Sequence, residues 1–205
     1  MTELAWTGWV LAGLVLALVA LWVVWGAASR LDRLHRRVRE SGATLDAQLV
    51  RRATAAWDLA ISGVLDPASS IIIAATARDA LDQMPAADVM GGTARTGTDG
   101  SPGGLAGAMM GADRTLAESE LSRALREALG RSEDQAQLAA EAGAAPLLET
   151  LEREWYRVQL ARRFHNDAVV AAGRIRAKWY VRVLRLAGRA PLPVTFEMDD
   201  EMGPP

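Results

Sequence analysis

Cysteine is absent from the 205 residues of this chain, and histidine occurs only twice, as His35 and His165. The lack of thiols excludes disulfides, a lipoprotein anchor and thiolate metal sites, and it fits a reducing compartment. The two histidines lie in different predicted helices, and neither an HExxH nor a GxSxG motif occurs. We therefore predict a protein that is not an enzyme, with no catalytic residues, no metal site and no cofactor.

Charged residues are absent from Leu4 to Ala28, an apolar run longer than the roughly 20 residues that cross a bilayer core. Tryptophans, which favour the membrane–water interface, stand near its two ends. They are Trp6, Trp9, Trp22 and Trp25. A cleaved signal peptide is the alternative, but no basic residue precedes the run and the run is too long for a signal sequence. We predict that residues 1–29 form a transmembrane anchor.

Basic residues cluster directly after the apolar run and are missing before it. The cluster comprises Arg30, Arg33, Arg36, Arg37 and Arg39. The positive-inside rule then places the amino terminus outside and the body of the chain in the cytoplasm. An extracytoplasmic body with reversed orientation is the alternative. The net charge of −2 gives no indication of nucleic-acid binding.

The first part of the body has the period of a helix. From Leu31 to Ala60, small and apolar residues recur at steps of three and four, which predicts one inward-facing stripe. No proline or glycine pair separates this helix from the anchor, so we expect the two to be continuous. Asp66 and Pro67 then predict the start of a second helix, which should end before Pro85.

A glycine-rich segment, 85–113, follows and predicts a flexible insert, because this composition buries too little apolar surface to offset its ordering entropy. A phosphate-binding loop is the alternative, but no lysine follows the glycines and no strand precedes them. The residues Thr115 to Glu118 match a capping box and predict a helix start, with the helix ending near Leu129 before Gly130.

A long helix is predicted from Leu147 to about Ala187, where Gly173 is the only glycine or proline. No stretch alternates over enough residues to predict a strand. The predicted fold class is therefore all-α: a single transmembrane helix that continues into an elongated antiparallel bundle of about four helices. The bundle covers 30–190, and an acidic, proline-containing tail covers 191–205.

Basic residues recur on one face of this last long helix. They are Arg174, Lys178, Arg182, Arg185 and Arg189. Apolar and aromatic residues, Trp179 among them, cover the opposite side. A basic amphipathic helix of this kind can contact anionic lipid head groups or a partner protein. The alternative is the solvent-exposed face of a packed bundle helix.

The stretch ARRFHNDAVV interrupts the apolar stripe of the same helix with polar residues. We predict that Arg162, His165, Asn166 and Asp167 form a structural polar cluster. Buried polar groups must be hydrogen-bonded, and these could bond one another or polar residues of the first helix such as Gln48 and Arg52. The alternative is a hydrolase or metal-dependent enzyme that uses His165 and Asp167.

The order of these motifs resembles the LemA family. The resemblance rests on the membrane span, on the helix RLDRLHRRVRESGATLDAQLVRRA, on LARRFHNDAV and on the tail motif TFE at Thr195 to Glu197. It implies a helical-bundle domain behind a single membrane helix, with no established enzymatic activity. It also implies association with membrane processes, including magnetosome formation in one branch, and often with a membrane-bound stress-response metalloprotease.

Three positions depart from the pattern of that family. Ala55 to Leu59 replace an Ile-Pro-Asn-Leu-Val run, Ala172 and Gly173 replace a second asparagine, and Lys178-Trp179 replace the proline that commonly ends the long helix. We therefore expect a diverged member that acts as a scaffold or adaptor at the bacterial cytoplasmic membrane. Its expected partners are the lipid bilayer, anionic lipid head groups and a membrane protein such as the metalloprotease, but not nucleic acid.

Overall fold

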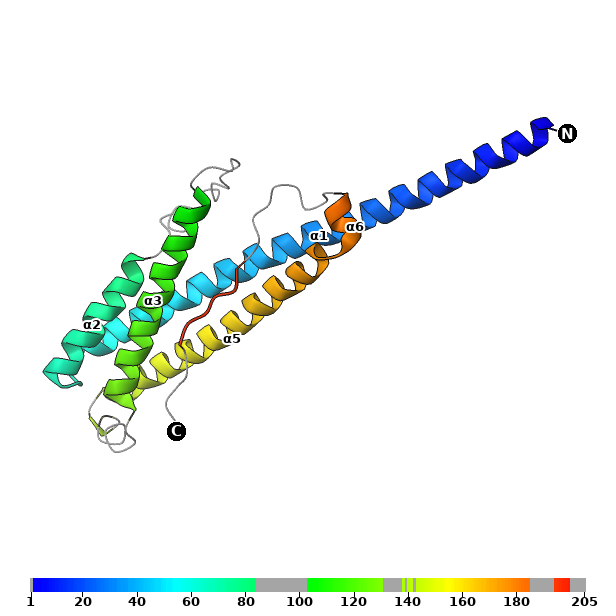
Figure 1. Cartoon of the computed structure of the whole chain (residues 1–205). Helices are drawn as coiled ribbons and strands as arrows, with labels where there is room; N and C mark the ends of the chain where they lie inside the picture. Colours follow the sequence, from blue (N-terminus) through cyan, green and yellow to red (C-terminus); the bar gives the residue numbers. More distant parts are fainter. Residues whose placement is uncertain are drawn as a thin grey trace. The chain divides into compact units, whose positions relative to one another are not determined.

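The computed structural model describes residues 2–83, 103–130, 138, 140, 141, 143–184 and 194–199 (Figure 1). Its helices are α1 (Thr2–Ile61), α2 (Pro67–Asp82), α3 (Gly103–Leu129), α5 (Ala144–Arg176) and α6 (Trp179–Val183). No strand occurs within these ranges, so the predicted all-α class is confirmed for the part of the chain that the structure describes. The expected continuity of the apolar run with the first body helix is also confirmed, because α1 is one unbroken helix.

The chain divides into two compact units, which are described separately. The first unit consists of residues 1–39 and 168–193, and the second of residues 40–167 and 194–205. Both α1 and α5 therefore contribute one part of their length to each unit. The first unit holds the uncharged run, and the second unit holds most of the buried apolar residues.

The uncharged part of α1 exposes its apolar side chains. Trp6, Trp9, Trp22 and Trp25 are between 69% and 79% exposed, and the leucines and valines from Leu11 to Val23 are also exposed. Within the described residues, α1 is the one helix long and apolar enough to cross a membrane, with a mean hydropathy of 2.3 over its most apolar window and none of that window buried. Length and composition thus allow a membrane span at the predicted place.

The core of the second unit is built on the predicted stripe of α1. Leu45, Leu49, Ala53, Ala56 and Ala60 are all buried, so the period of three and four identified the inward face correctly. Ala53, Ala56 and Ala60 share one core cluster with residues of α2, α3 and α5, among them Ile73, Leu121 and Trp155. The helices α2 and α3 lie side by side in it (Figure 1).

The start of α2 follows the sequence prediction. The Asp66 carboxylate accepts hydrogen bonds from the backbone N–H groups of Ala68 (3.0 Å) and Ser69 (3.1 Å), and Pro67 is the first helical residue. Hydrogen bonds with the side chain and backbone of Ser69, and with the backbone of Ala68, lower the pKa of Asp66. The helix ends at Asp82, before Pro85 as predicted.

The helix predicted to start at Thr115 begins earlier, because α3 already starts at Gly103 and includes residues 103–113 of the predicted insert. Thr115 consequently lies inside a helix and does not cap one: its hydroxyl donates to the carbonyl oxygen of Gly111 at 2.8 Å. Alanine, leucine and methionine alternate with the glycines here, and their helix propensity offsets the cost of about 1 kcal/mol per glycine. Residues 84–102, the remainder of the predicted insert, lie outside the described residues.

The predicted end of α3 at Leu129 is confirmed. A side chain at Gly130 would place its Cβ 2.3 Å from the carbonyl oxygen of Arg126, so this position requires glycine.

The predicted single helix up to Ala187 is also wrong, because α5 ends at Arg176 and a separate short helix, α6, follows. The N–H of Lys178 donates to the carbonyl oxygen of Ile175 at 3.2 Å, and Lys178 itself is extended, with φ −63° and ψ 134°. No proline lies at this break, and Gly173 is in the last turn of α5. The break does bury Val181 (1% exposed) and leave Trp179 exposed, whereas a straight helix would continue its buried stripe from Ala172 through 175 to 179.

Candidate functional site

The stretch ARRFHNDAVV of α5, for which an active site was the alternative interpretation, binds a segment near the carboxyl terminus. This segment, the C-terminal strap, is residues 194–199, which are neither helix nor strand (red in Figure 1). The side-chain amide of Asn166 on α5 donates to the carbonyl oxygen of Phe196 (3.2 Å), and its oxygen accepts from the N–H of Phe196 (2.9 Å). One asparagine thus satisfies both backbone groups of one strap residue, as a neighbouring strand would.

Apolar side chains hold the strap as well. Met198 is buried in a small cluster with Leu45 and Leu49 of α1 and Val158 of α5, and Phe196 packs against the same cluster. Residues 194–199 of the predicted acidic tail are therefore packed against α1 and α5. Residues 191–193 and 200–205 lie outside the described residues.

Two arginines of α3 hold the strap by its charge and its ring. The guanidinium of Arg114 lies 5.9 Å from the centre of the Phe196 ring and makes a 2.7 Å ion pair with Asp46 of α1. Arg126 makes hydrogen bonds to both carboxylate oxygens of Asp199, one of them at 3.1 Å. The N–H of Asp199 also donates to the Ser119 hydroxyl at 3.3 Å. The strap is therefore bound through backbone, aromatic and carboxylate groups together.

His165 belongs to the same contact region. Its Nδ1 lies 3.2 Å from the hydroxyl oxygen of Ser41 on α1, and its ring also hydrogen-bonds the backbone of Val194. Burial lowers the pKa of His165, while the Val194 backbone and the charge of Asp46 act in the opposite direction. A neutral imidazole between a hydroxyl and a backbone group links α1, α5 and the strap.

The predicted polar cluster thus has partners that the sequence did not suggest. Asn166 and His165 bond the strap and Ser41 instead of each other or Gln48, and Arg162 is half-buried on the same helix. Asp167 is exposed. The pairing of Asn166 with Phe196 spans 30 residues and depends on tertiary structure, so spacing along one helix gives no signal for it.

A buried ion pair further along α1 was missed by the sequence analysis. Arg52 and Glu118 form a 2.7 Å salt bridge in which neither side chain is more than 1% exposed. Arg52 also donates to the Ser122 hydroxyl (2.9 Å) and lies 5.4 Å from the Trp155 ring centre. Burial raises the pKa of Glu118, and the nearby charge of Arg52 offsets part of that effect. The pair joins α1, α3 and α5.

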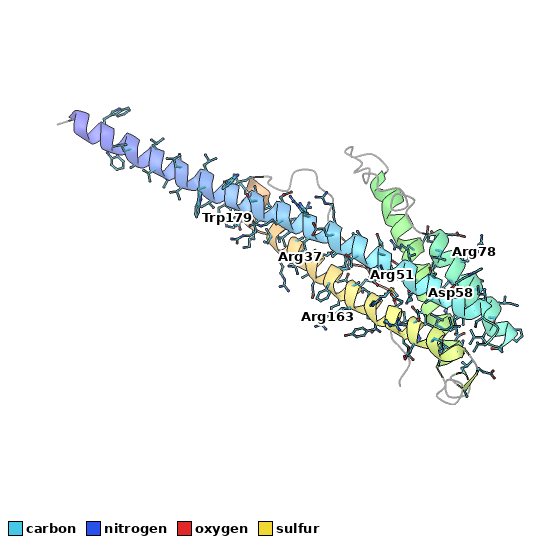
Figure 2. The ribbon with its side chains drawn as sticks, turned by 180° about the vertical axis from the view of Figure 1, so that it is seen from behind. Arg37, Arg51, Asp58, Arg78, Arg163 and Trp179 are labelled. Carbon is cyan, nitrogen blue, oxygen red and sulfur yellow. The ribbon has the colours of Figure 1, made fainter. Side chains whose placement is uncertain are left out.

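The first unit holds the predicted lipid- or partner-contact residues. Arg174 is exposed on α5, Lys178 is exposed at the break, and Arg182 is exposed on α6. Trp179, the first residue of α6, is exposed as well (Figure 2). The prediction placed them on one straight helix. In the structure, the break separates Arg174 from the other three. Arg185 and Arg189 lie outside the described residues.

His35 connects α1 and α5 within the same unit. Its Nε2 lies 3.4 Å from a guanidinium nitrogen of Arg176. Burial, followed by the charges of Arg176 and Arg39, lowers the pKa of His35, while Asp32 opposes them. A neutral His35 ring can accept a hydrogen bond from Arg176, so the contact favours the uncharged form.

Among the described residues, no three histidine, aspartate and glutamate side chains come together as a metal site would require. Comparisons with protein-family models, with curated proteins and with solved structures gave no match. The resemblance to the LemA family therefore stays a prediction from the motifs of this sequence.

Proposed function

We propose that the chain is a non-enzymatic, membrane-anchored scaffold or adaptor of the LemA type, which organises partners at the cytoplasmic face of a bacterial cytoplasmic membrane. The supporting observation is a contrast along α1. Except for the half-buried Val24, its leucine, valine and tryptophan side chains from Leu11 to Trp25 are exposed, whereas its inward stripe from Leu45 to Ala60 is buried. An apolar surface of that extent is far more stable in a bilayer than in water.

In this proposal α1 crosses the membrane once, and the second unit is an elongated antiparallel bundle of about four helices. The common core of α1, α2, α3 and α5 supports the bundle. The five arginines from Arg30 to Arg39 all have exposed side chains, which supports their placement at a cytoplasmic surface. One of them, Arg37, is labelled in Figure 2.

The arrangement around His165 favours a structural role over catalysis. Its ring is hydrogen-bonded to a hydroxyl and a backbone group, and the neighbouring Asp167 points to solvent. An imidazole that acts as a general base needs a substrate proton within hydrogen-bond reach. In this chain the position is taken by Ser41 and the strap.

The orientation can be tested with reporters fused after Pro205. A cytoplasmic body predicts a fluorescent fusion and an inactive alkaline phosphatase fusion, because the phosphatase matures only outside the cytoplasm. High phosphatase activity without fluorescence would contradict the cytoplasmic orientation and support the reversed one. A fusion after Met1 should behave in the opposite way.

The scaffold role can be tested by affinity capture of the full-length protein after crosslinking in intact membranes. We expect a membrane protein to be captured repeatedly, and a metalloprotease is the partner class that the resemblance implies. A tagged anchor alone, residues 1–29, serves as control. Recovery of the same proteins with the anchor alone would contradict a scaffold role for the helical body.

A further inference from the structure

The short helix α6 exposes apolar residues that a protein in water would normally bury. Trp179 is 75% exposed, Val183 is 71% exposed, and Leu184, directly after the helix, is 48% exposed. The cause is the burial of Val181 at 1% exposure. At about 100° per residue, positions two before and two after a buried residue both face away from it and lie within about 40° of each other. Fixing Val181 inward therefore turns Trp179 and Val183 outward together.

Basic residues surround this apolar face. Lys178 precedes Trp179, Arg182 lies between Tyr180 and Val183, and all three of Lys178, Trp179 and Arg182 are exposed. The Lys178 ammonium lies 5.9 Å from the Tyr180 ring centre, and the Trp179 and Tyr180 rings meet edge to face at 6.0 Å. The result is an aromatic and aliphatic surface bordered by cations.

The first unit carries a strong excess of positive charge. The stretches 1–39 and 168–193 contain eleven arginines and lysines against two acids, Glu3 and Asp32. Asp32 is itself paired with Arg36 at 3.0 Å. The same unit contains the exposed apolar part of α1. A binding partner that complements this unit should combine an apolar interior with a negatively charged surface.

We propose that α6 and Leu184 form a lipid-docking surface, in which Trp179 and Val183 insert into the interface of an anionic bilayer and Lys178 and Arg182 bind its phosphate head groups. The inference rests on the proposed membrane anchoring and deepens it by assigning a second contact with the bilayer. Tryptophan is suited to the interface because its ring is apolar and its N–H is polar. Each basic residue near an anionic lipid surface increases the affinity for that surface about five-fold.

The absence of cysteine makes single-cysteine labelling of the full-length chain possible. Three variants, Val15→Cys, Asp58→Cys and Val183→Cys, each carry an environment-sensitive fluorophore in vesicles whose phosphatidylcholine has brominated acyl chains. Val15 reports the anchor, Val183 reports α6, and Asp58, exposed on α1 (Figure 2), gives the baseline. We expect strong quenching at Val15, quenching at Val183 when phosphatidylglycerol is included, and little at Asp58.

The outcomes separate the two proposals. Quenching at Val15 with only baseline quenching at Val183 would overturn the docking surface and leave the anchor standing. Baseline quenching at Val15 would overturn the anchor, and the docking surface with it. Equal quenching at Val183 with and without phosphatidylglycerol would overturn the role of charge.

A charge reversal tests the basic residues directly. Lys178→Glu with Arg182→Glu, added to the labelled Val183→Cys chain, should weaken docking on anionic vesicles at least 25-fold, about five-fold per residue. The matched control is Arg51→Glu with Arg78→Glu, which changes the net charge equally at two exposed positions of the second unit (Figure 2). Equal effects of the two pairs would overturn specific docking by Lys178 and Arg182.

Discussion

At the residue scale, Arg52 is the largest side chain that is completely buried among the described residues. It ends between Glu118, Ser122 and Trp155, so one residue of α1 fixes the positions of α3 and α5. Isolated buried charges are costly, and a buried pair is stable only with its partner present. The pair therefore specifies how these helices meet more than it adds to their stability.

We expect Arg52→Met to lower the free energy of unfolding by about 3–5 kcal/mol, because it leaves the Glu118 carboxylate buried without its counter-charge. Adding Glu118→Leu should recover most of the loss. Urea unfolding of the full chain in detergent micelles, followed by circular dichroism, measures both. The control is Arg51→Met at the adjacent exposed arginine (Figure 2). Equal losses for Arg51→Met and Arg52→Met would contradict the structural role of the pair.

Asn166 is expected to control whether the C-terminal strap stays bound. Asn166→Ala removes both hydrogen bonds to the Phe196 backbone and should cost about 1–3 kcal/mol. Amide hydrogen exchange at Phe196 should accelerate, while exchange in α2 stays unchanged. Asp167→Ala, at the exposed neighbour, is the matched control. Slow exchange at Phe196 in Asn166→Ala would show that the strap does not depend on this asparagine.

His165 should make the second unit sensitive to acid. Its pKa in the folded state lies below the ordinary value of 6.5, so the unfolded chain takes up the proton first as the pH falls. The stability contribution is therefore present above pH 6.5 and lost as the pH falls towards the lower folded pKa. His35 shifts in the same direction, so the comparison must be made with His165→Gln. Unfolding midpoints between about pH 7 and about pH 5 should fall less steeply in the variant; parallel curves would contradict the assignment.

At the scale of the elements, the sequence predicted those features of the helices that depend on neighbouring residues alone. The stripe of α1, the Asp66 cap and the end of α3 before Gly130 all follow from periodicity and backbone chemistry within a few residues. The start of α3 and the break after Arg176 do not. The latter accompanies the burial of Val181, a tertiary contact that the local sequence around Arg176 does not predict.

Because α5 and α6 are separate helices, we expect proline to be tolerated at the break, which a continuous helix would not allow. Trp179 is the first residue of α6 and follows an extended Lys178, which is the conformation that proline prefers before it. Trp179→Pro should therefore change the free energy of unfolding by no more than about 1 kcal/mol. Ala171→Pro, inside α5, should cost about 3 kcal/mol or more. Equal losses in thermal unfolding would contradict the break.

At the scale of the whole molecule, the sequence predicted the exposed apolar run but not the strap. The run is visible because a bilayer imposes length and composition on a contiguous segment. The strap depends on Asn166, Arg114 and Arg126 meeting residues that are far away in the sequence. The resemblance pointed to TFE and to FHNDAV as separate motifs, and the structure shows that Asn166 of one binds the backbone of Phe196 in the other.

The anchor predicts how the full chain partitions between membrane and water. Leu14→Arg with Leu18→Arg places two charges in the middle of the exposed apolar run, at a cost of about 2.5–3.5 kcal/mol each for membrane insertion. The protein should then leave the membrane pellet on alkaline carbonate extraction. Ile71→Arg with Ile72→Arg adds the same charge at exposed positions of α2 and should leave the protein in the pellet. If the Leu14 and Leu18 variant resisted extraction as the wild type does, α1 would not be held by the bilayer core, because two unpaired arginines there should outweigh most of the insertion energy of a single span.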